Sequence, residues 1–270
     1  MNKVRIIDTH THYTHRYFEG DEKKNKKFRN EILRHLSEHD IYAVIEAAIG
    51  YESNQKMMKL CEEHSNVYAA VGVHPNCVGE LTEEKYEAIK GILCTEKVLA
   101  IGETGLDYAG KKDSKNFEIQ QKWFRRFIEL ALETKMPLVI HCREAEDDLV
   151  EILTEYKERF GEYAGIVHCF SGEEEHAEKL IEMGFFLGIG GKFSDNLKTV
   201  KEIPLDAIVL ETDCPYLLPA GLTEKPNTSF NIPYIVKQLA ELKEVDEQEI
   251  LEAALKNTVK LYPVFEKFLI

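Results

Sequence analysis

Short apolar runs alternate along the whole chain with longer amphipathic stretches. The apolar runs lie at 4–7, 42–49, 67–73, 98–101, 137–141, 165–168, 185–189 and 207–213. Each is a continuous apolar stretch, which is typical of parallel strands that are buried on both faces. Between the runs, apolar residues recur at helical spacing, as Phe124, Phe127 and Ile128 do within 116–134. The pattern predicts eight strands alternating with helices, and a long polar loop at 13–26.

Capping residues mark the starts of several predicted helices. Thr82 precedes two acidic residues and has the pattern of an N-cap. Ser171 and Glu174 fit a capping box, and Asp246 and Glu249 fit a second one near the end of the chain. These signals predict helices that begin shortly after the preceding strands.

The repeated strand–helix alternation predicts the fold class. It favours an α/β protein with a single TIM (β/α)8 barrel over 1–270, although a doubly wound open sheet would also fit the alternation. Two features favour the barrel: the strand count is eight, and polar residues follow the carboxyl ends of the strands, where barrel active sites lie. No Pro-, Gly- or Ser-rich linker divides the chain, so we expect one domain.

The charge balance limits the classes of partner. The net charge is −14, which argues against broad non-specific nucleic-acid binding, because such binding needs patches of Lys and Arg. It does not exclude a phosphate substrate, since bound metal ions can supply local positive charge. No apolar run approaches the ~20 residues of a membrane helix. We therefore expect no membrane association and no obligate protein partner.

The cysteine pattern indicates the compartment. Six cysteines in 270 residues do not form a disulfide scaffold, and we expect reduced thiols in a cytoplasmic protein. Cys142, Cys169 and Cys214 each directly follow a candidate metal ligand. Alternation along a strand would turn these thiols away from the ligands, which argues against thiol catalysis.

Polar residues that follow the apolar runs carry the candidate chemistry. His10 and His12 close the first strand, and side chains two residues apart point to the same side, so both can reach one divalent ion. The full set of such residues is His10, His12, Glu103, His141, His168 and Asp213. A lone histidine is more often a core or surface residue, and an aspartate can merely cap a helix. Six such residues at the strand ends argue against that interpretation.

Six ligands exceed the needs of one catalytic ion, which takes about three protein ligands and a water. They fit two ions about 3.5–4 Å apart with a bridging carboxylate. Four histidines permit Zn, Mn, Fe or Co, and the carboxylates also tolerate Mg. The set predicts hydrolysis by a metal-activated water. Asp213, on the last strand, is the best candidate to orient that water and accept its proton.

Seven short motifs carry a resemblance to a known family. They are Asp-Thr-His-Thr-His at 8–12, Gly-Val-His-Pro at 72–75, Ile-Gly-Glu-Thr-Gly-Leu-Asp at 101–107, Ile-His-Cys-Arg at 140–143, His-Cys-Phe-Ser-Gly at 168–172, Leu-Glu-Thr-Asp-Cys-Pro-Tyr at 210–216 and Asn-Thr at 257–258. In this order they resemble the TatD family of metal-dependent deoxyribonucleases, among the amidohydrolase-like barrels. The resemblance implies a TIM barrel, divalent metals and hydrolysis of phosphodiester or related bonds.

The resemblance also implies how the ligands divide between the metals. His10, His12, Glu103 and Asp213 would hold the first ion, and Glu103 would bridge to a second ion that His141 and His168 also hold. Glu103 therefore joins Asp213 as a predicted catalytic residue.

One segment departs from the family pattern. Where the family has Arg-Asn-x-Pro, this chain has Phe230, Asn231, Ile232 and Pro233. Phenylalanine cannot supply the guanidinium fork that suits a phosphate, which puts the usual nucleic-acid contact in doubt.

Other residues could contact the substrate. We predict His74, Arg143 and Asn231 as substrate contacts, with Lys225 as a further phosphate partner. His74 could instead only cap its strand. Arg143 could instead pair with nearby acidic residues, namely Glu144, Glu146, Asp147 and Asp148.

Three functions remain open from the sequence. The first is hydrolysis of DNA, at 3′ ends or in short single strands, so that the partner is a nucleic acid or a small phosphoester. The second is hydrolysis of a lactone, an amide or an aminoacyl ester on tRNA by the same fold, which the missing arginine and the negative charge favour. The third is metal binding without turnover. Six ligands argue against it, because a structural zinc site closes with four.

Overall fold

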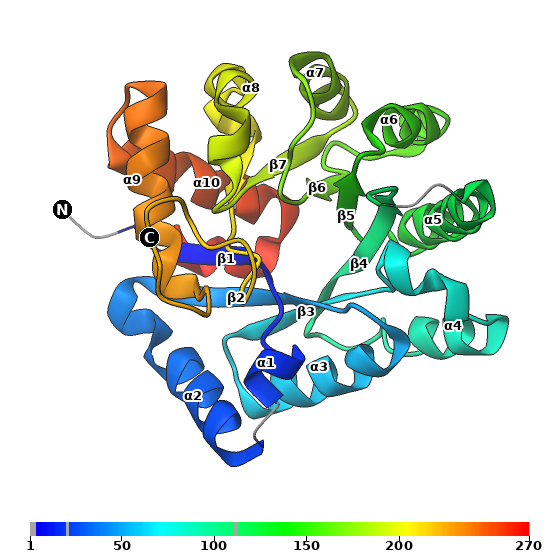
Figure 1. The fold of residues 1–270 in the computed structure, drawn as a ribbon, viewed down its shortest axis with the longest axis horizontal. Coiled ribbons are helices and arrows are strands. Elements are labelled where there is room, and N and C mark those ends of the chain that lie inside the picture. The colour runs from blue at the N-terminus through cyan, green and yellow to red at the C-terminus, as the bar shows by residue number, and fades with distance from the viewer. Residues whose placement is uncertain (1–3, 20–21, 111–112, 270) are drawn as a thin grey trace.

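The computed structural model describes residues 4–19, 22–110 and 113–269. Eight parallel strands form one sheet in which each strand pairs with the next in sequence (Figure 1). The strands are β1 (Ile6–Thr11), β2 (Ile41–Ala47), β3 (Val67–Val71), β4 (Val98–Asp107), β5 (Leu138–Arg143), β6 (Gly165–Val167), β7 (Phe185–Ile189) and β8 (Ile208–Leu210). Their continuous apolar sequences match their burial, because both faces of the sheet are covered.

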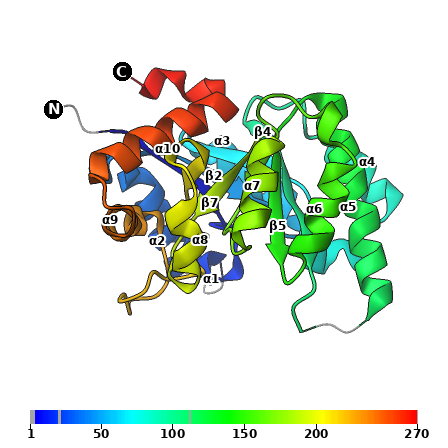
Figure 2. The same cartoon turned by 90° about the horizontal axis from the view of Figure 1, so that it is seen from above.

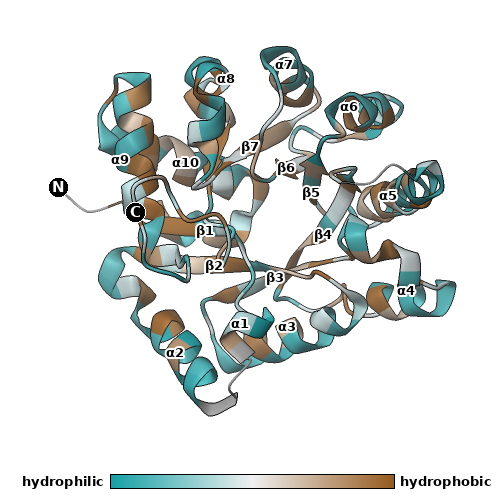
Figure 3. Ribbon diagram, viewed as in Figure 1, coloured by the Kyte–Doolittle hydropathy of each residue, from teal (hydrophilic) through white to brown (hydrophobic). Residues whose placement is uncertain are grey.

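Most of the helices form an outer ring around the sheet (Figure 1). The helices are α1 (Arg16–Glu19), α2 (Glu22–His35), α3 (Tyr51–Glu63), α4 (Glu83–Lys90), α5 (Ser114–Thr134), α6 (Glu146–Thr154), α7 (Glu174–Glu182), α8 (Leu197–Glu202), α9 (Ile232–Lys243) and α10 (Glu247–Leu261). Figure 3 shows hydrophobic residues along the strands and hydrophilic residues over the outer surfaces of the helices. The amphipathic stretches of the sequence therefore cover the outside of the sheet.

The sheet closes on itself between β1 and the segment after β8. Thr11 pairs with Cys214 in an isolated parallel bridge. The N–H of Asp213 donates to the carbonyl of His10 at 3.0 Å, and the N–H of His12 donates to the carbonyl of Cys214 at 2.7 Å. The predicted (β/α)8 barrel is confirmed, and the open doubly wound sheet is wrong.

The amino-terminal end of the barrel is plugged. Leu255 and Val259 of α10, with Tyr262 and Phe265, pack against apolar side chains of the strands such as Tyr68. Figure 2 shows α10 lying across this end, opposite the carboxyl ends of the strands. Polar residues that follow the strands are therefore at the end that α10 leaves open.

Three local predictions need correction. The predicted loop at 13–26 contains α1 and the start of α2, and its residues 20–21 lie outside the described part of the chain. Charged residues there form helix well without an apolar stripe to reveal it. The predicted capping box at Ser171 is wrong, because Glu173 caps α7 and its N–H donates to the ring of His176. The fourth strand is longer than predicted and includes Glu103.

Other boundary predictions hold. Thr82 caps α4 by accepting the N–H of Lys85, and Asp246 and Glu249 form the predicted capping box of α10. Among the residues that the structure describes, no helix is both long enough and apolar enough to span a bilayer.

Candidate metal centre

All six predicted metal ligands meet at the carboxyl end of the barrel. A cavity of about 690 Å³ opens beside them, and five of the six, all but His10, line it. His10 lies in β1, Glu103 in β4 and His141 in β5, while His12, His168 and Asp213 lie just beyond the ends of β1, β6 and β8. Residues spread over most of the chain are thus collected because every parallel strand ends at the same rim.

His10, His12 and Asp213 form one half of the cluster. The Nε2 atoms of the two histidines lie 3.1 Å apart, and Asp213 Oδ1 lies 3.1 Å from His12 Nε2 and 3.6 Å from His10 Nε2. Nδ1 of His12 donates to the carbonyl of Ala47 at 3.0 Å, so that Nε2 faces the other two groups. Two imidazole nitrogens and a carboxylate directed at one point suit a divalent cation.

Glu103 joins this half to the other. Its Oε2 lies 3.5 Å from Nε2 of both His10 and His12. Its Oε1 lies 2.8 Å from His168 Nε2 and 2.9 Å from His141 Nδ1. One carboxylate therefore offers one oxygen to each pair of imidazoles, as a carboxylate shared by two ions does.

The electrostatics of the cluster fit cations. Burial alone would raise the pKa of Glu103, but the surrounding imidazoles, chiefly His168, hold that pKa well below its usual range. Burial opposes protonation of His12, yet Asp213 and Glu103 raise the pKa of His12 to about 9. Glu103 Oε2 is buried and has no hydrogen-bond partner among the described residues. Protons on the histidines thus balance the negative charge of the carboxylates. Metal ions would replace these protons, because metal ligands bind in the deprotonated form.

A third group, formed by His74, Asp107 and His141, has a different character. Nδ1 of His74 accepts the N–H of Asn76 at 3.0 Å, so the neutral ring carries its proton on Nε2, which lies 3.7 Å from Glu103 Oε1. Burial lowers the pKa of His74 to about 3 and keeps the ring neutral. His74 therefore presents an N–H to the cavity rather than a lone pair for a third ion.

Asp107 lies behind His141. Its Oδ2 is 3.3 Å from His141 Nε2 and also accepts from the side chain of Asn76 at 2.6 Å. A carboxylate behind a ligating imidazole fixes the ring and its tautomer.

The remaining predicted substrate contacts divide into two groups. His74 and Arg143 line the cavity, and Arg143 makes no ion pair with any residue of the described chain, contrary to the acidic-cluster alternative. Asn231 does not line it: its amide donates to Asn227 at 2.7 Å. Phe230 packs on the ring of His39, with ring centroids 4.2 Å apart, and Lys225 lies on an exposed loop.

The described structure contains no disulfide, but the orientation of the cysteines that follow candidate ligands differs from the prediction. Of these three, Cys142 and Cys169 line the cavity, whereas Cys214 is buried away from it. The alternation argument fails at Cys169 because β6 already ends at Val167 and the residue adopts φ 47°.

Sequence reasoning missed several residues of the site. Asp107 and Lys192 line the cavity, and Glu211 lies against His168. Asp107 carried a signal, because it lies four residues after Glu103 in β4, and even spacing along a strand places side chains on one side.

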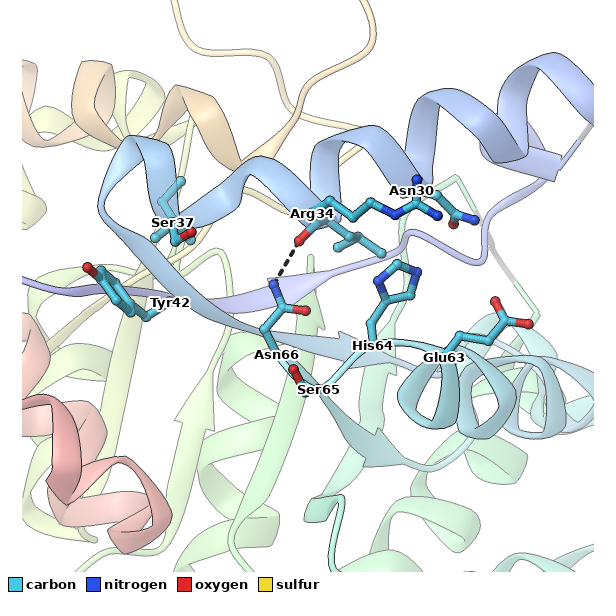
Figure 4. A pocket seen from close by; sticks show the side chains of 10 residues that line it. Asn30, Arg34, Ser37, Tyr42, Glu63, His64, Ser65 and Asn66 are labelled. Atoms are coloured by element: carbon cyan, nitrogen blue, oxygen red, sulfur yellow. Dashed lines mark hydrogen bonds between the residues drawn. The ribbon is translucent and has the colours of Figure 1, made fainter.

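A second cavity, of about 730 Å³, lies at the amino-terminal end, between α2 and the loop before β3 (Figure 4). His64, Arg34 and Asn66 line it, and the amide of Asn66 donates to the carbonyl of Leu33 at 2.8 Å. Within the described residues, every group of three potential metal ligands lies at the opposite end. This cavity therefore lacks the donor set of the carboxyl end.

Comparison with known proteins identifies the family. Residues 7–263 match the family described as TatD related DNase. The chain belongs to this TatD family. It is 35% identical over 264 residues to an uncharacterized metal-dependent hydrolase, YabD of Bacillus subtilis (strain 168), covering 96% of this chain and 99% of that protein.

Two further TatD-family relatives bear on the site. The 3′-5′ ssDNA/RNA exonuclease TatD of Citrobacter rodentium (strain ICC168) is 30% identical over 227 residues, covering 79% of this chain and 83% of that protein. The crystal structure of YjjV, a TatD homologue of Escherichia coli K12, superposes with a TM-score of 0.86 at 29% identity, covering 96% of this chain and 98% of that one. This chain is therefore a TatD-family barrel of the metal-dependent hydrolase class.

Proposed function

We propose that this metal-dependent hydrolase cleaves phosphodiester bonds of DNA, at 3′ ends or in short single strands, with two divalent cations, Zn, Mn or Mg. One observation carries the proposal. Glu103 directs Oε2 to His10 and His12 and Oε1 to His141 and His168, so that one carboxylate serves two ligand sets.

The residues would divide the cations between them. His10, His12 and Asp213 would hold the first, His141 and His168 the second, and Glu103 would be shared. Cations held in this way lower the pKa of a bound water towards neutrality and polarise a phosphoryl oxygen.

Asp213 is suited to accept the proton of the attacking water. Burial would raise its pKa, but His12 and the other imidazoles lower it, so the group is an ionised base at neutral pH. Its side chain is 11% exposed, against 2% for Glu103, and it lines the cavity. Its position is fixed by backbone bonds, since its N–H donates to His10 and its carbonyl accepts the N–H of Tyr216.

Two groups in the cavity are suited to a phosphate. His74 presents its Nε2 proton as a neutral donor, and Arg143 offers a guanidinium at the rim that forms no ion pair among the described residues. Asn231 would act only indirectly, through Asn227, whose amide donates to the carbonyl of Thr212 beside Asp213.

A second candidate function is hydrolysis of another ester, a lactone, an amide or an aminoacyl-tRNA ester by the same water. Phe230 favours it, because the ring packs on His39 at the position where the family has a phosphate-suited arginine. The cavity of about 690 Å³ beside the cluster argues against the third candidate, a closed structural metal site. We further propose that the protein works in the cytoplasm, which suits the lack of a disulfide in the described structure, and that it needs no obligate protein partner.

The test is cleavage of 3′-labelled single-stranded DNA by protein stripped of metal and reloaded across a divalent series. A lactone and an aminoacyl ester run in parallel. We expect metal-dependent loss of 3′ nucleotides. Turnover of only the other esters would establish the second function, and full metal loading without turnover of any substrate would establish the third.

A further inference from the structure

Glu211 is a buried carboxylate behind the wall of the cavity, with no role in the proposed chemistry. It is 0% exposed and follows β8 directly. Oε1 accepts the N–H of Cys169, whereas Oε2 has no hydrogen-bond partner among the described residues. A buried charge without a compensating partner is costly, so its retention calls for an explanation.

The neighbouring cationic group is the ring of His168. Glu211 Oε1 lies 3.7 Å from His168 Nδ1, which is itself buried without a hydrogen-bond partner. The other nitrogen, Nε2, lies 2.8 Å from Glu103 Oε1. The ring of His10 stacks on that of His168 at 3.8 Å and 5°, which restricts how far the His168 ring can tilt. The imidazole of His168 therefore lies between the carboxylate of Glu103, which the two cation positions would share, and the carboxylate of Glu211.

We infer that Glu211 is a positioning residue that acts through His168 to set the cation affinity of the second position, an inference that rests on the two-cation site proposed above. With the second cation bound, Glu211 would accept the Nδ1 proton of His168 and leave the lone pair of the ring on Nε2, towards Glu103. The inference requires the 3.7 Å separation to shorten to a hydrogen bond when the second cation binds. Glu211 does not line the cavity, so it acts without touching the substrate.

Two glycines beside Glu211 provide a substitution that displaces its carboxylate and a matched control, and neither changes His168 itself. A Cβ at Gly188 would lie 2.3 Å from Glu211 Oε2, so alanine there would displace the carboxylate. A Cβ at Gly190 would lie 3.4 Å from Glu211 Cγ, at ordinary contact distance. Both glycines line the cavity, which makes Gly190→Ala a matched control for Gly188→Ala.

The experiment titrates Mn²⁺ into metal-stripped full-length protein and follows it by electron paramagnetic resonance, which separates single ions from spin-coupled pairs. Glu211→Gln and Gly188→Ala should each weaken the second Mn²⁺ about 10- to 100-fold, the usual effect of losing an outer partner of a ligand. The first Mn²⁺ should bind as in the wild type, and Gly190→Ala should retain both ions. Circular dichroism checks that each variant is folded.

Folded Glu211→Gln that binds both ions with wild-type constants would overturn the inference. Equal weakening of both ions would also overturn it, because it would indicate a general structural role. Failure of the proposed nuclease function has a different signature: wild-type protein would bind two ions yet cleave no DNA. That result would leave the role of Glu211 intact.

Discussion

The two ends of the barrel differ in whether their polar groups have hydrogen-bond partners. At the amino-terminal end, Lys97 Nζ donates to the carbonyls of His64, Ser65 and Val67, and Asn66 donates to Leu33. At the carboxyl end, buried polar atoms lack partners within the described chain, namely His10 Nδ1, Glu103 Oε2, His141 Nε2, His168 Nδ1 and Glu211 Oε2.

This difference separates stability from function. Buried polar groups are nearly always satisfied in native proteins, and the unsatisfied Glu103 Oε2 faces Nε2 of both His10 and His12, where a cation would supply the missing partner. At the amino-terminal end Lys97 and Asn66 are satisfied from within, the buried hydroxyl of Tyr262 has no partner among the described residues, and α10 plugs the barrel. Substitutions at that end should alter the free energy of unfolding, and substitutions at the carboxyl end should alter metal content and rate.

The largest effect should come from Asp213→Asn at the carboxyl end. The amide cannot accept the proton of water, and general-base groups contribute about 10²–10⁴-fold, so kcat should fall by that factor. The measurement is kcat with metal content determined on the same sample, because Asp213 is also a predicted ligand. A near-wild-type kcat would remove Asp213 from the catalytic role.

His141→Ala should follow in size. Removing a ligand of the second position should weaken metal binding by at least about 10- to 100-fold, the effect of losing even an outer-shell partner. The unfolding transition should change little, since His141 borders the cavity rather than the apolar core. Elemental analysis checks the metal, and undiminished metal with full turnover would exclude His141 from the site.

Arg143→Ala should lower kcat/KM on DNA by about 10- to 150-fold, because a hydrogen bond to a charged group contributes about 1.5–3 kcal/mol. A neutral lactone serves as the control substrate and should be unaffected. Equal losses on both substrates would mean that Arg143 acts on the fold of the rim and does not hold a phosphate.

Phe230→Arg tests the carboxyl end at the position where the chain departs from the Arg-Asn-x-Pro pattern of its family. Arginine at this position would supply the guanidinium fork that suits a phosphate, so from the sequence alone a gain in DNA cleavage would be expected. The structure packs Phe230 on His39, outside the cavity lining, so we expect no gain and a loss of about 0.5–3 kcal/mol in unfolding free energy. Denaturation and kcat/KM on DNA decide between the two, and a gain in kcat/KM would restore the missing phosphate contact.

The smallest effect should come from Asn66→Ala at the amino-terminal end. Losing its hydrogen bond to Leu33 should cost about 0.5–1.5 kcal/mol in unfolding free energy. Activity at saturating metal should stay at the wild-type level. A fall in kcat without a fall in stability would show that the two ends are coupled.

The barrel and the convergence of the six candidate ligands could be predicted from the sequence because both depend on one regular feature. Parallel strands buried on both faces give continuous apolar runs, and His141 or Asp213 follows such a run directly. Asp107 and Glu211 escaped prediction because their positions depend on where the strands end: β4 extends to Asp107, whereas β8 stops at Leu210. The orientation of Cys169 escaped for the same reason, since alternation holds only within a strand.

The seam that closes the barrel has a consequence for how the chain is held together. The backbone bonds of the seam are made by His10, His12, Asp213 and Cys214, so the first cation position spans the first and last strands. A divalent ion coordinated by both His12 and Asp213 would act as a reversible cross-link, closing a loop of about 200 residues. In the chain-entropy description of cross-links, such a loop removes on the order of 5 kcal/mol of unfolded-state entropy. The second position gathers its ligands from 103 to 168 and closes a much shorter loop. The first ion would therefore fasten the first strand of the barrel to the segment after the last one, as well as serve the chemistry.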